Sequence, residues 1–177
     1  LGGECDFVTD LAIWYPLRVI MTILGIPKED EPLMLKLTQE LFGGTDPDIA
    51  RSFEPMEIMN VVGDFESYFK ELTINRRKNP TEDLASLIAN SKIDGESPPE
   101  LETNGYYMIV ATAGHDTTSS SVSGGLLALM DNPAEMEKLK SNLDKLMPTF
   151  IDETIRWVTP VRHFMRTATQ DYTLRDT

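Results

Sequence analysis

The segment from residue 101 to residue 130 places the strongest constraint on what this chain can fold into. It contains no proline and is apolar on both sides of its centre, at residues 106–110 and at residues 126–130. A segment of this length and pattern predicts one long helix that is buried along much of its length. Its centre is unusual for a helix, because the glycines and hydroxyl residues between Gly114 and Gly125 have low helix propensity.

One stripe of this expected helix changes from apolar residues to very small residues and then to a hydroxyl group. By the three-and-four spacing of helix faces, its members are Ile109, Val110, Ala113, Gly114 and Thr117. A flat apolar ligand fits against the small residues, with the Thr117 hydroxyl and the Asp116 carboxylate placed to handle protons. Spacing alone favours a simpler interpretation, in which small residues let two helices cross closely.

Length and composition limit the class of protein. The 177 residues suffice for one domain, and 41% hydrophobic and 25% charged residues are ordinary for a soluble globular protein. A net charge of -13 argues against a nucleic-acid partner. The single cysteine, Cys5, excludes an internal disulfide. No apolar run approaches the roughly 18 residues that span a bilayer, so we expect a cytoplasmic protein without a membrane segment.

The rest of the chain reads as mostly helical. Pro16 suits the first position of a helix that Gly25 ends, and Thr81 suits the cap of a short helix. Asn132 and Pro133 are placed to cap and begin another helix. Further helices are expected at residues 30–42, 58–79 and 143–158, a turn or small hairpin at 93–99, and the beginning of a strand at 164–174.

Three motifs occur in order along the chain. Residues 113–118 read Ala-Gly-His-Asp-Thr-Thr, residues 153–156 read Glu-Thr-Ile-Arg, and residues 160–167 read Pro-Val-Arg-His-Phe-Met-Arg-Thr. Together they resemble the oxygen-activating helix, the Glu-x-x-Arg helix and the haem-propionate segment of the cytochromes P-450, the haem-thiolate monooxygenases. Residues 5–27 are also similar to this family, so the resemblance covers essentially the whole chain.

The resemblance implies a mainly α fold. Residues 1–177 would be a single-domain fragment, the central part of the cytochrome P-450 fold, with the long oxygen-activating helix, the roof helices, the Glu-x-x-Arg helix and a little β structure at the C-terminal end. The N-terminal helices and the loop that carries the axial cysteine would lie outside this chain. Cys5 stands in no similar context and is not assigned as a ligand.

The resemblance also implies roles for individual residues. Thr117 would bind dioxygen or its water by a hydrogen bond, and Asp116 would relay protons toward it. Ala113 and Gly114 would let the haem and the substrate approach the helix. Ile109, Thr112 and Val161 would form walls of the substrate pocket, for which plain core packing is the alternative.

Charged residues complete the expected site. Glu153 and Arg156 would form a structural pair, which a surface salt bridge would also explain. Arg166 is similar to the arginine that binds a haem propionate, and Arg162 is a competitor for that role. Neither His115 nor His163 has a partner at metal-ligand spacing, so both are interpreted as structural or solvent-exposed.

The function implied is a bacterial haem b monooxygenase that hydroxylates a small apolar substrate, a terpenoid alcohol, with dioxygen and electrons from a ferredoxin-type partner. The 177 residues alone would be inactive, since the thiolate that promotes O–O cleavage is not among the matched motifs. One alternative is a non-catalytic helical fragment or interaction module. Another is a phosphate cradle, which the glycine spacing and the lack of lysine between Lys92 and Lys138 disfavour.

Overall fold

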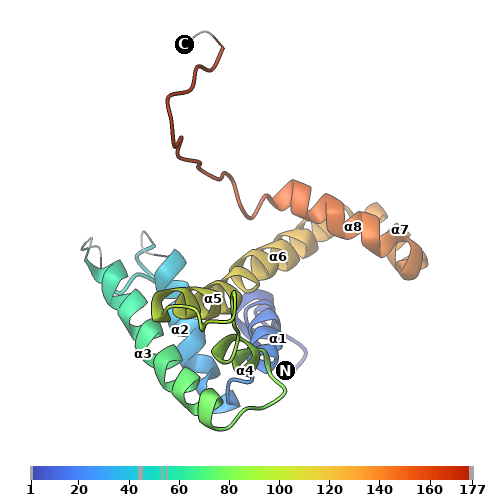
Figure 1. Cartoon of the computed structure of the whole chain (residues 1–177). Helices are drawn as coiled ribbons and strands as arrows, with labels where there is room; N and C mark the ends of the chain where they lie inside the picture. Colours follow the sequence, from blue (N-terminus) through green and yellow to red (C-terminus); the bar gives the residue numbers. More distant parts are fainter. Residues whose placement is uncertain (1, 44–45, 53, 55, 176–177) are drawn as a thin grey trace.

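Helices form nearly all of the regular structure in the computed structural model, which describes residues 2–43, 46–52, 54 and 56–175 (Figure 1). The elements follow in the order η1 (Val8–Ala12, a π-helix), α1 (Trp14–Leu24), η2 (Lys28–Asp30, a 3-10 helix), α2 (Glu31–Phe42), α3 (Glu57–Lys78), α4 (Leu84–Ala89), α5 (Glu100–Ala113), α6 (Asp116–Asp131), α7 (Pro133–Ser141) and α8 (Leu143–Val158). This order confirms the predicted mainly α fold class.

One apolar core is formed by residues of the five helices α1, α2, α3, α4 and α5. Along α3, Val61, Phe65 and Phe69 recur every fourth residue and are all buried, as a helix with one apolar face requires. The Phe69 ring stacks on Phe65 with centroids 5.9 Å apart and on Tyr107 of α5 at 4.9 Å. The Tyr107 hydroxyl donates a hydrogen bond to the Ala85 carbonyl oxygen at 2.8 Å, so its one polar group is satisfied inside the core.

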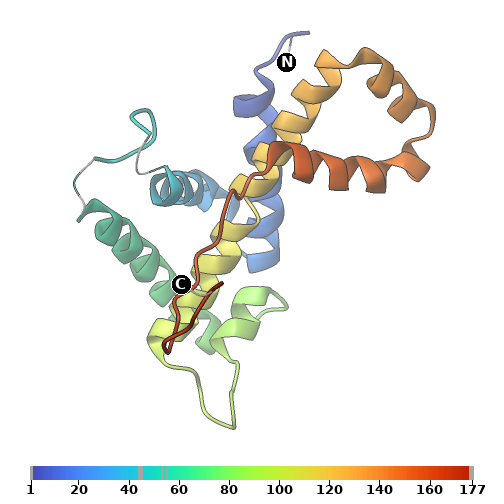
Figure 2. The ribbon, with the colours of Figure 1, turned by 90° about the horizontal axis from the view of Figure 1, so that it is seen from above.

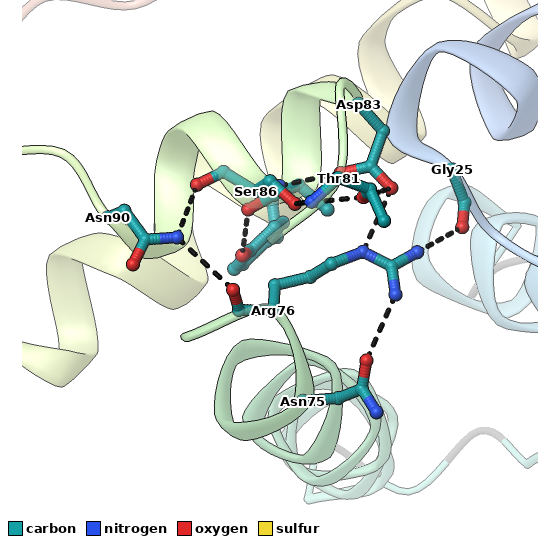
Figure 3. Close-up of polar contacts among 9 residues, drawn as sticks. Gly25, Asn75, Arg76, Thr81, Asp83, Ser86 and Asn90 are labelled. Carbon is teal, nitrogen blue, oxygen red and sulfur yellow. Dashed lines mark hydrogen bonds and ion pairs between the residues drawn. The ribbon is translucent and has the colours of Figure 1, made fainter. Parts of the chain in front are cut away.

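A polar network closes one end of this core, where α1, α3 and α4 meet (Figure 3). The Arg76 guanidinium donates through Nε to Asp83 Oδ2 at 2.8 Å and through Nη2 to the Gly25 carbonyl oxygen at 2.7 Å. Asp83 also caps α4, because its Oδ1 accepts from the Ser86 backbone N–H at 2.7 Å. The prediction that Thr81 caps this helix is wrong: its hydroxyl donates to Asp83 Oδ2 instead, at 2.7 Å.

The expected single helix over residues 101–130 is two helices. The α5 helix ends at Ala113, α6 begins at Asp116, and Gly114 and His115 lie between them. Hydroxyl groups bond back to the preceding turn here, with Thr117 Oγ1 donating to the Ala113 carbonyl oxygen at 3.0 Å. Such bonds compete with the backbone ladder and bend a helix, which accounts for an interruption at this point.

The helices α6, α7 and α8 project from the core as a helical arm (Figures 1 and 2). In this arm α8 packs along α6, and α7 connects them. Pro133 begins α7 as predicted, whereas the Asn132 side chain does not cap it and donates to the Ala128 carbonyl oxygen at 2.9 Å. None of the helices within the described residues has the length and apolar character needed to cross a bilayer.

Residues 159–175 contain no strand and extend away from the helices (Figure 1). The strand expected at 164–174 is therefore not formed, because a strand is stable only when a neighbouring strand accepts its backbone hydrogen bonds. The turn predicted at residues 93–99 is confirmed by an isolated antiparallel bridge between Ile93 and Glu96, with Gly95 at a φ of 88°. Pro16 is the third residue of α1 rather than the first, since η1 leads into that helix.

Candidate active site

A hollow of about 1660 Å³ opens beside the junction of α5 and α6. One wall comes from this junction, and another comes from α8 and the residues that follow it. Phe7 and Phe42 contribute from the first quarter of the chain. The lining is mostly apolar, and the polar groups are concentrated at the helix junction and after α8. A concave, apolar surface with a few grouped polar side chains is the usual form of a site for a small molecule or cofactor.

Asp116 and Thr117 both line this hollow at the first turn of α6. The Thr117 hydroxyl donates its proton to the Ala113 carbonyl oxygen, which leaves its oxygen lone pairs as acceptors. Burial raises the pKa of the Asp116 carboxyl group, while the neighbouring His115 acts in the opposite direction. Asp116 therefore retains a proton to a higher pH than an exposed aspartate does.

The His115 side chain lies next to this carboxyl group, on the side away from solvent. Its side chain is only 1% exposed, and its Nε2 atom lies 3.0 Å from the Ile13 carbonyl oxygen. Its Nδ1 atom lies 3.4 Å from Asp116 Oδ1, without the geometry of a hydrogen bond. Of the two interpretations made from the sequence, the structural one is confirmed for His115, whereas His163 is exposed.

The structure gathers the predicted pocket residues around the hollow. Its lining includes six of the predicted residues: Ile109, Thr112, Ala113, Asp116, Thr117 and Val161. Gly114 is absent from the described lining, and a Cβ atom there would lie 2.8 Å from Ile20 Cδ1 of α1. Gly114 therefore permits the close crossing of two helices, which was the simpler interpretation of the small residues.

The arginines are distributed differently from the prediction. Arg162 lines the hollow, but Arg166 does not: its Nη1 donates to the Met165 carbonyl oxygen at 2.9 Å, and its guanidinium carbon lies 5.7 Å from the Phe164 ring centroid. Glu153 and Arg156 are paired by two hydrogen bonds of 2.6 Å, with side chains 56% and 66% exposed. The pair predicted from the spacing therefore exists, and it stands at the surface.

Sequence reasoning missed part of the lining. The sequence predicts a helix at residues 143–158, and in the structure Phe150, Ile151 and Ile155 of this helix face the hollow. Helical periodicity predicts an apolar face but does not say what that face contacts. Phe7 and Phe42 had no local signal at all, because only the tertiary fold brings them to α5 and α6.

Comparisons with known proteins agree with this geometry. A family model described as Cytochrome P450 matches residues 54–177. Cytochrome P450-terp from a Pseudomonas species is 46% identical over 98% of this chain, which covers 42% of that protein. The methyl-branched lipid omega-hydroxylase of Mycobacterium tuberculosis is 36% identical over 98% of this chain, which covers 40% of that protein.

Solved structures give the same result. The crystal structure of CYP108D1 from Novosphingobium aromaticivorans matches with a TM-score of 0.81 and 47% identity, over 99% of this chain and 40% of that one. This chain thus spans about two fifths of the length of these relatives. The family model covers most of the chain, and the relatives align with nearly all of it. The resemblance found in the sequence motifs is therefore confirmed, and the chain belongs to the cytochrome P450 family.

Proposed function

We propose that these residues belong to a haem-dependent monooxygenase that hydroxylates a small apolar substrate, a terpenoid alcohol, using dioxygen and electrons from a ferredoxin-type partner. One observation carries the proposal. Asp116 and Thr117 lie together at the break between α5 and α6, and both line an apolar hollow. A proton-holding carboxyl group beside a hydroxyl group, in a largely apolar hollow, suits a reaction in which dioxygen must be protonated as it is split.

The hollow fits a haem group in size and character. Its volume of about 1660 Å³ exceeds the roughly 300–1,000 Å³ of a typical site for one small ligand, which leaves room for a macrocycle and a substrate. Ala113 is exposed in this wall and presents only a methyl group. Arg162 supplies a permanent positive charge for a propionate, and Arg166 lies four residues further on. When bound, haem would supply the redox chemistry of C–H hydroxylation.

Within this proposal, Thr117 and Asp116 divide the handling of protons. The Thr117 oxygen, with its own proton held by the Ala113 carbonyl, accepts a hydrogen bond from water or a protonated ligand in the hollow. The Asp116 carboxyl group holds a transferable proton, because burial raises its pKa. Proton transfer would run from Asp116 to an acceptor that Thr117 orients.

The proposed substrate class follows from the other walls. Ile109 and Val161 offer apolar surface, whereas Thr112 is the polar member of the predicted pocket residues. Its hydroxyl donates to the Met108 carbonyl oxygen at 2.7 Å, so what it can offer a substrate is an acceptor. An apolar molecule with one hydroxyl donor is complementary to this set, which supports an alcohol of terpenoid type.

A second candidate applies to the 177 residues by themselves. Cys5 is their only cysteine, and it is exposed and absent from the described lining of the hollow. We propose that these residues alone do not supply the thiolate ligand that the monooxygenase reaction needs, and are inactive as an isolated helical module. Glu153 and Arg156, paired at the surface, would serve there as a structural pair only.

The test uses the protein that the source gene encodes, reconstituted with haem and supplied with a ferredoxin, its reductase and alpha-terpineol. We expect a thiolate-type shift of the Soret band with carbon monoxide and a hydroxylated product. Asp116→Asn and Thr117→Ala should each lower product formation by about 10²- to 10⁴-fold at unchanged haem content. Asp131→Asn, at the other end of α6, is the matched control.

Three results would contradict the proposal: no Soret shift, no oxygenated product, or equal loss in Asp131→Asn. Nucleotide binding without a Soret change would favour the phosphate cradle, and neither response would favour the non-catalytic module. The same titration of the isolated 177-residue chain should give no thiolate-type band.

A further inference from the structure

His115 is a buried titratable side chain that the proposed reaction does not use. It lies between α5 and α6, 1% exposed, under a cover that includes the Ile13 backbone. Its neighbour Asp116 has a side chain that is 37% exposed and lines the hollow. The buried imidazole of His115 thus lies next to the carboxyl group of Asp116, which faces the proposed site.

The backbone of Ile13 determines which ring nitrogen carries hydrogen. A carbonyl oxygen can only accept a hydrogen bond, and His115 Nε2 lies 3.0 Å from it. The hydrogen of the neutral ring must therefore be on Nε2, and Nδ1 carries a lone pair. Nδ1 is buried and has no hydrogen-bond partner among the described residues.

The atom that faces this lone pair is also an acceptor. Asp116 Oδ1 lies 3.4 Å from His115 Nδ1, and an ionised carboxylate has no hydrogen to donate. Two acceptor atoms with no proton between them repel each other at this distance. The repulsion costs free energy because Nδ1 is buried and has no other partner among the described residues. A proton on either atom converts the repulsion into attraction, as a carboxylic acid facing an imidazole or as an imidazolium facing a carboxylate.

We propose that His115 is a positioning residue that shares one dissociable proton with Asp116 across the Nδ1–Oδ1 gap and so keeps a proton-bearing carboxyl group at the edge of the hollow. The role of His115 in turnover rests on the proposed function, whereas the sharing of a proton with Asp116 does not depend on that function. When Asp116 gives its proton to an acceptor in the hollow, the carboxylate regains one from water through the same opening. The His115 side chain is buried and therefore provides no path for a proton to solvent.

The other charged groups around this pair are not among the causes that shift the pKa of Asp116. Burial is the main influence on the pKa of Asp116 and raises it, whereas a proton on the His115 ring acts against it. Other charged groups lie on the elements packed around the pair or line the same hollow: Asp10 of η1, Arg18 of α1, Arg156 of α8, and Arg162 and His163 after it. Asp10 accepts from the Asp6 backbone, Arg18 pairs with Glu31, and Arg156 pairs with Glu153.

The first experiment follows the Asp116 carboxyl carbon by NMR across a pH titration. His115→Gln retains a donor where Nε2 stood, for Ile13, and removes the Nδ1 acceptor. We expect the pKa of Asp116 to fall in His115→Gln, because the protonated carboxyl group loses the Nδ1 acceptor that faces it. His163→Gln removes the other histidine and should leave the Asp116 titration unchanged. An unchanged Asp116 titration in folded His115→Gln overturns the proposal.

A second variant decides the matter if His115→Gln does not fold. Asp116→Asn should change the ¹⁵N signal of Nδ1 and leave that of Nε2 in place, since only Nδ1 faces the altered group. Two unchanged signals also overturn the proposal. In the haem-loaded protein, His115→Gln should shift the pH profile of product formation, and Asp131→Asn, at the far end of α6, should not. If no monooxygenase activity exists at all, the two NMR results still stand or fall by themselves.

Discussion

The Nη2 atom of Arg76 donates a hydrogen bond to the carbonyl oxygen of Gly25 at 2.7 Å, although the two residues are 51 positions apart. The same guanidinium binds Asp83 Oδ2 at 2.8 Å, and the two side chains are only 15% and 12% exposed (Figure 3). One arginine thus joins the ends of α1, α3 and α4. A buried and well-paired charge affects the free energy of unfolding mainly when one partner is removed, because the other is then left unpaired.

Replacing Arg76 by methionine should destabilise the chain strongly. The change retains the apolar stem and removes the charge, which leaves Asp83 without its cation and the Gly25 carbonyl without this donor. We expect the free energy of unfolding in urea to fall by about 2–4 kcal/mol. Lys78→Met, at the exposed end of the same helix, is the control and should change it by less than about 0.5 kcal/mol. Equal effects of the two variants would contradict this account.

The same network predicts acid sensitivity. Burial raises the pKa of Asp83, but hydrogen bonds from Thr81 and Ser86 and the charge of Arg76 outweigh it and hold that pKa below its usual value. A depressed carboxyl pKa gives stability that is present above the unfolded value of about 3.9 and is lost as pH falls through the folded value. Stability should therefore fall below about pH 4, and Asp83→Asn should flatten that part of the profile. A parallel slope in Asp83→Asn would argue against this assignment.

Local periodicity predicted the helices well but not how they are joined. The spacing of Phe65 and Phe69 is sufficient to predict α3 and its buried face. The prediction of one continuous helix was wrong, although the hydroxyl residues that bend the chain between α5 and α6 are visible in the sequence. The neighbours of this break could not be predicted locally, because Ile20 and Ile13 are about a hundred residues away in the chain.

The same distinction applies to the site. Ala113, Asp116 and Thr117 could be found because their motif is contiguous, and the structure brings them to one hollow. The role of Asp83 as a cap could not be separated from that of Thr81 by sequence, since both residue types cap helices. The strand at 164–174 failed for a related reason: alternation gives a strand its faces but cannot supply the partner that pairs with it.

Gly25 should tolerate no side chain. Its φ of 70° disfavours any L-residue by about 1–2 kcal/mol, and a Cβ atom would collide with the Asp83 carboxyl group. Gly25→Ala should therefore destabilise more than Gly95→Ala, where φ is 88° but no atom lies within 4 Å. Thermal unfolding monitored by circular dichroism measures both, and the difference between them isolates the collision. Equal midpoints would show that the Asp83 side chain can move aside at no cost.

Two adjacent tyrosines offer a test of the buried hydrogen bond in the core. Tyr107 is fully buried and its hydroxyl donates to the Ala85 carbonyl oxygen, whereas Tyr106 is 52% exposed. Tyr107→Phe should lower the free energy of unfolding by about 1–2 kcal/mol, since a buried hydrogen bond is lost while the ring stack is retained. Tyr106→Phe should change it by less than about 0.5 kcal/mol. Urea denaturation with matched slopes would measure both, and a reversed order would contradict the described core.

The contact between α6 and α8 should depend on the absence of a side chain at Gly125. A Cβ atom there would lie 2.6 Å from Thr154 Cγ2 and 3.1 Å from Thr154 Oγ1, so an added methyl group must push α8 away. Gly105→Ala in α5 is the matched control, because no atom lies within 4 Å of its Cβ position. It should stabilise the chain by about 0.5–1 kcal/mol through helix propensity alone.

Hydrogen exchange should locate the effect of Gly125→Ala. Amides of α8 should exchange faster, while those of α3, in the separate core, should keep their protection. Because α8 also forms one wall of the hollow, the same variant should alter the site without touching Asp116 or Thr117. Faster exchange throughout the chain would instead mean that the arm and the core unfold as one cooperative unit, and unchanged exchange in α8 would mean that the two helices do not pack as described.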